Sequence, residues 1–129
     1  MPKRITIIGS GNVATHMAKA LYAKGCVIVE IAGRTLAHAQ TLAQTVNAHA
    51  ASDVQKLLPA DIYIIAVTDA AIPEVAKKLN AGDVPVAHTS GSTDITVLNK
   101  FTHHGVLYPL QTFSRERPLD WDTVPLFIA

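Results

Sequence analysis

The amino-acid sequence predicts an α/β domain in which a mainly parallel sheet carries helices on both faces. Apolar runs rich in β-branched residues, clearest at residues 5–8 and 61–67, alternate with segments whose apolar residues recur at helical spacing. Hydrophobic residues make up 49% of the chain and aromatic residues only 5%, a composition typical of a sheet buried between helical layers. Strands that alternate with helices pair in parallel through right-handed crossovers, so a doubly wound sheet follows.

The first part of the chain is expected to hold three strands and two helices. The strands are predicted at residues 5–8, 26–32 and 47–51, and the helices at residues 12–24 and 36–46. Gly25 is placed to end the first helix. The side chains expected to face the sheet are Val13, Met17, Ala20, Leu21, Leu36, Ala39, Leu42, Ala43 and Val46. Positions on the surface are expected for His16, Lys19, His38 and His49.

The second part continues the alternation of strands and helices. Ser52 or Asp53 is expected to cap a brief helix that ends before Pro59. A strand at residues 61–67 leads into a helix with Asp69 as its cap and Pro73 in its first turn. Further elements are predicted at residues 84–88 (strand), 94–100 (helix) and 106–108 (strand). Residues 124–129 resemble a strand without a stop signal, so we expect residues 1–129 to be one domain of a longer protein.

Charge and composition exclude several classes of function. The formal net charge is +1 and the basic residues are scattered, which argues against a nucleic-acid partner. No stretch approaches the ~18 apolar residues of a membrane span. The Met-Pro-Lys-Arg start runs directly into a strand, so we expect a cytoplasmic protein with no membrane partner. Cys26, the single cysteine, cannot form an internal disulfide and is expected to be buried as a small hydrophobic side chain.

A glycine turn joins the first predicted strand to the first helix. Gly9-Ser10-Gly11 with Ala14 is the G-x-G-x-x-A pattern of dinucleotide-binding turns. Gly9 permits the tight turn, Gly11 lets a pyrophosphate approach the backbone, and Ala14 lets the helix pack against the strand. The phosphates would face the positive end of the helix dipole. This context predicts a Rossmann-type fold that binds a nucleotide, and the alternative is a tight glycine turn without a ligand.

The tip of the second strand distinguishes between the two nicotinamide cofactors. An NAD-specific site places a carboxylate there, on the ribose hydroxyls. Here the tip reads Gly33-Arg34-Thr35, and Glu30 lies too far back along the strand to be the ribose ligand. Arg34 would hold a ribose 2′-phosphate by charge-assisted hydrogen bonds, a preference of about 10- to 150-fold for NADP over NAD. The alternative for Arg34 is an ordinary solvated side chain. Thr35 is expected to cap the next helix, bind the phosphate, or do both.

Five segments together carry a resemblance to one family. They are residues 8–14, 33–35, 60–72, 88–92 (His-Thr-Ser-Gly-Ser) and 105–114 (Gly-Val-Leu-Tyr-Pro-Leu-Gln-Thr-Phe-Ser). With them, the chain resembles the N-terminal Rossmann domain of NADP oxidoreductases related to pyrroline-5-carboxylate reductase. Deazaflavin-dependent NADP reductases and the 6-phosphogluconate dehydrogenase-like superfamily are wider relatives. The resemblance covers almost the whole chain, and the last two segments are its more specific motifs.

The resemblance implies a role for each matching residue. It places the pyrophosphate of NADP on Gly9, Ser10, Gly11, Asn12 and Val13, and the 2′-phosphate on Arg34 and Thr35. It places Val67, Thr68 and Asp69 along the cofactor cleft, and residues 88–90 near the nicotinamide. Family members continue into a C-terminal helical domain that dimerises and closes the substrate pocket. We expect residues 1–129 to end before that domain, so the resemblance implies cofactor binding by this chain and a homodimer in the full-length protein.

Catalytic residues are expected at the carboxyl ends of the later strands. His88, Ser90, Tyr108 and Gln111 are the polar groups predicted there, and His88 is the best proton donor by its reference pKa. The alternative for His88 is a hydrogen-bonded residue at a strand end. Ser90 lacks a Gly-x-Ser-x-Gly context, so we expect it to position a ligand. Tyr108 stands where relatives often carry histidine, which leaves its catalytic role in doubt. No set of residues has metal-ligand spacing, including His103-His104.

The sequence therefore predicts an NADP-binding domain of an oxidoreductase. Its reaction would transfer a hydride to or from a small C=N or C=O substrate, with the chemistry supplied by the cofactor. The alternative is a non-enzymatic module that senses NADP or binds a partner. Another adenine ligand, such as S-adenosylmethionine, is disfavoured because Arg34 stands where a neutral ribose would meet a carboxylate.

Overall fold

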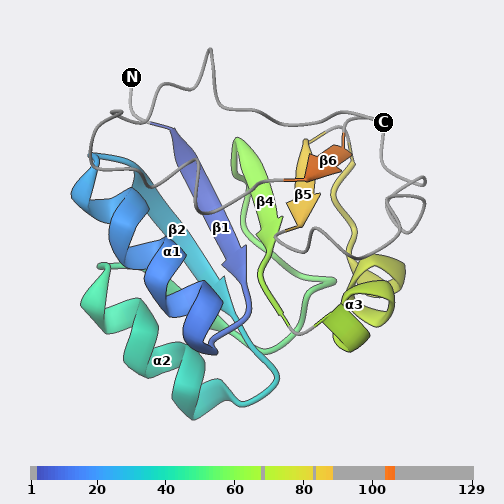
Figure 1. Cartoon of the computed structure of the whole chain (residues 1–129), viewed down its shortest axis with the longest axis horizontal. Coiled ribbons are helices and arrows are strands. Elements are labelled where there is room, and N and C mark those ends of the chain that lie inside the picture. The colour runs from blue at the N-terminus through green and yellow to red at the C-terminus, as the bar shows by residue number, and fades with distance from the viewer. Residues whose placement is uncertain (1–2, 68, 83, 89–103, 107–129) are drawn as a thin grey trace.

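The computed structural model describes residues 3–67, 69–82, 84–88 and 104–106, which form a sheet with helices packed against it (Figure 1). The strands are β1 (Arg4–Ile8), β2 (Val27–Ala32), β3 (His49–Ala51), β4 (Ile62–Ile65), β5 (Val86–His88) and β6 (His104–Val106). The helices are α1 (Asn12–Ala23), α2 (Leu36–Thr45) and α3 (Ile72–Lys78), and a short 3-10 helix, η1 (Asp69–Ala71), precedes α3. The predicted alternation of strands and helices is confirmed from β1 to β3 and again from β4 to β5.

The order of the strands creates a switch point in the middle of the sheet. All neighbouring strands are parallel, in the order β3-β2-β1-β4-β5-β6. The chain moves outward from β1 through β2 to β3, then returns to β4 beside β1 and moves outward on the other side (Figure 1). Doubly wound sheets of this kind bind their ligands outside the carboxyl ends of the strands where the order reverses, here at β1 and β4.

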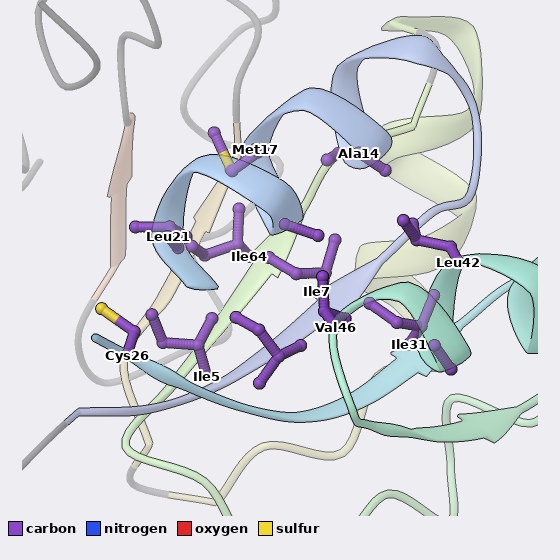
Figure 2. Packing of buried hydrophobic residues seen from close by; sticks show 14 of the residues in the cluster. Ile5, Ile7, Ala14, Met17, Leu21, Cys26, Ile31, Leu42, Val46 and Ile64 are labelled. Carbon is purple, nitrogen blue, oxygen red and sulfur yellow. The ribbon is translucent and has the colours of Figure 1, made fainter. Parts of the chain in front are cut away.

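The sheet is buried on both faces, as its apolar strands require. Successive side chains of a strand point to opposite faces. Accordingly, Ile5 and Ile7 of β1 pack with Met17 under α1 and α2 (Figure 2), whereas Ile8 packs with Ile72 on the α3 face. These contacts fix the helices against the sheet and thereby hold the turns between strands and helices in place. Among the described residues, no helix is long and apolar enough to cross a membrane.

The prediction of a brief helix before Pro59 is wrong, because residues 52–59 form turns and no helix. Asp53 instead begins a turn, in which its Oδ1 accepts the N–H of Gln55 at 2.9 Å and its carbonyl accepts the N–H of Lys56 at 3.2 Å. Pro59 follows too soon for a helix to grow beyond its costly first turn. Asp53 thus accepts a backbone N–H close by in the sequence, as a capping residue would, but it organises a loop and caps no helix.

Two predicted core positions are wrong for a common reason. Val13 is 47% exposed and Leu36 is 43% exposed. Each lies in the first turn of its helix, where the chain is still leaving the edge of the sheet, so Ala14 and Ala39 occupy the first buried positions. The remaining sheet-facing predictions of these helices hold, except that Ala20 is only half-buried.

Smaller differences concern the ends of elements. The N-cap of α3 is Ala71, so Asp69 does not cap this helix and instead begins η1. Pro73 lies at the start of α3, as predicted. Of the strand predicted at residues 106–108, Val106 alone is described, as the last residue of β6. The predicted helix at residues 94–100 and the strand-like run at 124–129 lie outside the described residues.

Candidate functional site

The first glycine of the turn after β1 is required by the fold itself. Gly9 has a φ of +133°, which side chains rarely tolerate. Its N–H donates to the carbonyl of Ala32 at 2.6 Å, and a Cβ at this position would collide with the carbonyl oxygen of Ala66. The turn is therefore wedged between the ends of β2 and β4, and glycine at this position supports the architecture with or without a ligand.

The second glycine of the same turn has no such structural reason. Gly11 is the N-cap of α1 with a φ of −82°, a conformation open to any residue. A Cβ at Gly11 would meet no protein atom within 4 Å. The space above its backbone is therefore left open, at the position where the glycine pattern places a pyrophosphate.

The start of α1 offers hydrogen-bond donors and no negative charge. Gly11 has no side chain to cap the helix, and no acidic residue lies in the first turn. The first amide groups of a helix lack partners within the helix, and they carry the positive end of its dipole. Asn12 and Val13 are exposed at this end. The arrangement fits an anionic group such as a pyrophosphate.

The turn after β2 packs directly against the glycine turn. The N–H of Gly33 donates to the carbonyl of Ala51 at 2.9 Å, and a Cβ at Gly33 would lie 3.0 Å from Oγ of Ser10. The exposed residues Arg34 and Thr35 follow, at the start of α2. Thr35 is the N-cap residue, but its side chain makes no capping hydrogen bond, and the first turn of α2 contains no acid. Its hydroxyl is thus available to a ligand.

Two of the described acidic side chains, Glu30 and Glu74, are engaged in hydrogen bonds within the protein. Glu30 is 5% exposed, and its Oε1 accepts the N–H of Leu58 at 2.9 Å, which confirms that it is not at the strand tip. Glu74 on α3 binds Lys78 at 3.1 Å. The hydrogen bond from Lys78 lowers the pKa of Glu74, and the charge of Arg34 adds a smaller effect in the same direction.

A buried polar cluster on the α3 face was not predicted. The hydroxyl of Tyr63 donates to the carbonyl of Leu58 at 3.1 Å. The N–H of the same residue, Leu58, donates to Glu30. Burial raises the pKa of Tyr63, and the charge of Glu30 adds to this effect. Thr6 of β1 lies between them in the sheet, in register with Glu30 of β2 and with Tyr63 of β4. The two bonds to Leu58 fasten the loop before β4 to the sheet. Its sequence signal was the glutamate and tyrosine inside otherwise apolar strands.

The other predicted site residues are placed only in part. Val67 follows β4, and its Cγ1 would lie 3.3 Å from a Cβ at Gly9, so it borders the glycine turn. His88 ends β5 in register with Ile65, and is completely buried. Thr68, Ser90, Tyr108, Gln111 and His103 lie outside the described residues, and their predicted roles stay predictions. Within the part of the chain that is described, no group of side chains suits a metal ion.

The switch point, the wedged glycine turn and the open start of α1 together define a Rossmann-type NAD(P)-binding domain of the oxidoreductase class. Residues 1–103 match the family model described as shikimate / quinate 5-dehydrogenase, and the chain belongs to that family. None of the curated proteins compared with the chain matches it.

Solved structures agree with this class. A candidate NADP oxidoreductase from Bacteroides fragilis is 36% identical, with a TM-score of 0.74 over 99% of this chain and 51% of its own. A protein from Thermotoga maritima is 24% identical, with a TM-score of 0.66 over 87% of this chain and 42% of its own. A pyrroline-5-carboxylate reductase from Coxiella burnetii is 23% identical, with a TM-score of 0.64 over 78% and 40%. The last two show the fold, and the resemblance inferred from the sequence is confirmed.

Proposed function

We propose that this chain binds NADP(H) within an oxidoreductase that transfers a hydride to or from a small C=N or C=O compound. The observation that carries the proposal is the open position at Gly11, on the uncapped N-terminus of α1. A glycine turn without a ligand would need Gly9, whose place the fold dictates, but not Gly11. The contrast between the two glycines favours a ligand that approaches the backbone.

The choice of NADP over NAD rests on the tip of β2. Arg34 and the hydroxyl of Thr35 lie at the open start of α2, beside the glycine turn. An arginine fork and helix amides suit a dianionic 2′-phosphate. Glu30, the acid that lies in the same strand, is buried and bound to Leu58. These features support a role for Arg34 and Thr35 in binding the 2′-phosphate.

The remaining roles extend this arrangement along the carboxyl edge of the sheet. Residues 9–13 would hold the pyrophosphate, while Val67, Thr68 and Asp69 would line the cofactor on the β4 side. Bound NADP(H) supplies the hydride. We assign Ser90 and Tyr108 to the vicinity of the nicotinamide and the substrate. The complete burial of His88 weighs toward its structural alternative, a hydrogen-bonded residue at the strand end, over a proton donor.

Residues 1–129 would be the cofactor domain of a larger enzyme. The chain spans about half the length of the Bacteroides fragilis structure. A following helical domain would close the substrate pocket and form a homodimer, so we expect this chain to bind cofactor without turning over a substrate. A non-enzymatic NADP sensor is the alternative, and a full-length protein that binds NADPH but reduces no imine or ketone would favour it.

The cofactor preference is tested by calorimetric titration with NADPH and, separately, with NADH. Replacing Arg34 with alanine should weaken NADPH binding by about 10- to 150-fold, because a hydrogen bond to a charged group is lost. NADH binding should barely change. Arg4→Ala is the matched control, since Arg4 is an exposed arginine at the amino end of β1. Equal losses of NADPH and NADH in Arg34→Ala would contradict the assignment of the 2′-phosphate.

A further inference from the structure

A pocket lies between α1 and α2, which run over the same face of the sheet (Figure 1). Its volume is about 260 Å³, and it is lined by Ser10, Thr15, Lys19, His38, Thr41, Leu42 and Thr45. Apart from Ser10, none of these residues belongs to the proposed cofactor site. The pocket is smaller than the roughly 300–1,000 Å³ typical of sites for drug-sized molecules, so it suits a small ligand.

The charge of this interhelical pocket favours an anion. Lys19 of α1 contributes an ammonium group, and His38 of α2 contributes an imidazole that donates a hydrogen bond in either protonation state. No aspartate or glutamate lines the pocket. Both side chains are exposed, so they can reorient toward a ligand. The pocket thus has two hydrogen-bond donors, one from each helix, and no acid among its lining residues, a composition that suits a small anion.

Two threonine hydroxyls of α2 also line the pocket, and they favour a different kind of ligand group. Oγ1 of Thr41 donates to the carbonyl of Ala37 at 3.0 Å, and Oγ1 of Thr45 donates to the carbonyl of Thr41 at 3.2 Å. A hydroxyl has one proton, so each oxygen now offers only lone pairs to the pocket. These oxygens suit ligand groups that donate hydrogen bonds. Leu42 is buried between them and provides an apolar base.

From these three features, we propose that the interhelical pocket binds a small organic phosphate that also carries hydroxyl groups. Lys19 and His38 hold the phosphate, and the oxygens of Thr41 and Thr45 accept hydrogen bonds from the hydroxyls of the ligand. This site is separate from the proposed dinucleotide site, and it does not depend on which nicotinamide cofactor the domain binds. Ser10, which lines the pocket and belongs to the glycine turn, connects the two sites.

The test is a titration of the isotopically labelled chain with glycerol 3-phosphate, followed through its backbone amide signals. Inorganic phosphate and glycerol, each used alone, separate the contributions of the two ligand ends. Lys19→Met removes the ammonium and keeps an apolar stem, and Lys24→Met at the end of α1 is its matched control. Thr45→Val removes one acceptor oxygen and keeps the shape of the side chain.

The expected result is saturable shifts centred on Thr15, Lys19, Thr41 and Thr45, with glycerol 3-phosphate bound more tightly than inorganic phosphate. Lys19→Met should weaken binding by about 10-fold or more and Thr45→Val by about 2- to 10-fold, because a charged hydrogen bond is worth more than a neutral one. Lys24→Met should bind normally.

Three results would overturn the proposal. They are the absence of binding, shifts confined to residues 9–13 and 34–36, or an affinity unchanged by Lys19→Met. Arg34→Ala separates this site from the cofactor site, because it should leave the affinity for glycerol 3-phosphate unchanged while it weakens NADPH binding.

Discussion

The starts of α1 and α2 differ from the start of α3 in the residues that accompany the unpaired backbone amides of the first turn. Neither α1 nor α2 has a capping side-chain bond or an acid in its first turn. In α3, Pro73 removes one amide donor and Glu74 brings a negative charge to the positive end of the dipole. No side-chain cap bond is present at α3 either, but its start carries a negative charge, whereas the starts of α1 and α2 carry none and leave their amide donors uncompensated.

This difference shows that the starts of α1 and α2 lack interactions that would make the folded state more stable. An N-cap or an acid at the start of α1 or α2 would each contribute a few tenths to about 2 kcal/mol. Both helix starts lie on the carboxyl edge of the sheet. Helix starts without a cap or an acid are expected at a binding site, where an anionic ligand supplies the negative charge. The same logic explains Gly11, which the backbone does not require.

The comparison is tested most strongly by giving α1 the acid that α3 has. Asn12→Asp should stabilise the free domain by about 0.3–1 kcal/mol, because a carboxylate then faces the helix dipole. The same change should weaken NADPH binding by about 10-fold or more, because like charges brought together cost several kcal/mol. Denaturant unfolding and calorimetry measure the two effects. Asn12→Gln is the neutral control, and an Asp variant that binds NADPH normally would contradict an anion site at α1.

The converse change, at α3, should have a smaller effect that depends on pH. The pKa of Glu74 is lowered, first by the hydrogen bond from Lys78. A carboxyl group with a lowered pKa stabilises the folded state above its unfolded-state pKa, and this contribution is lost as the pH falls through the folded-state value. Glu74→Gln should therefore be slightly less stable than the native chain at pH 7 and equally stable near pH 3. Thermal unfolding across this range measures the difference, and a constant difference would show that the charge of Glu74 is irrelevant.

Most of the fold could be predicted from the sequence because its signals are local. A few consecutive residues are enough to predict the apolar strands β1 and β4 and the glycine turn between β1 and α1. The loop at residues 52–58 could not be read in this way, because Asp53 favours a helix cap and a turn almost equally. What decided it was Pro59 and the fastening of Leu58 by Glu30, a residue far away in the sequence.

The candidate site could be predicted from the sequence only where its residues belong to a single turn after a strand. Gly9, Gly11 and Arg34 are proposed as site residues from their positions after strands, and the structure adds why the two glycines differ. The interhelical pocket has no such signature, because Lys19 and His38 line one pocket only after two helices pack on one sheet. The exposure of Val13 and Leu36 was missed because helical periodicity does not tell where a helix passes the edge of the sheet.

The most direct test of the account is to replace Gly11 with alanine and to measure both unfolding and NADPH binding. The free energy of unfolding should change by no more than about 1 kcal/mol, because a Cβ at Gly11 meets no protein atom within 4 Å and only the N-cap preference is altered. NADPH should bind about 5- to 150-fold more weakly, since crowding a well-fitted contact costs about 1–3 kcal/mol. Unchanged NADPH binding, or a loss of stability that explains the lost binding, would contradict the claim that Gly11 is kept open for the cofactor.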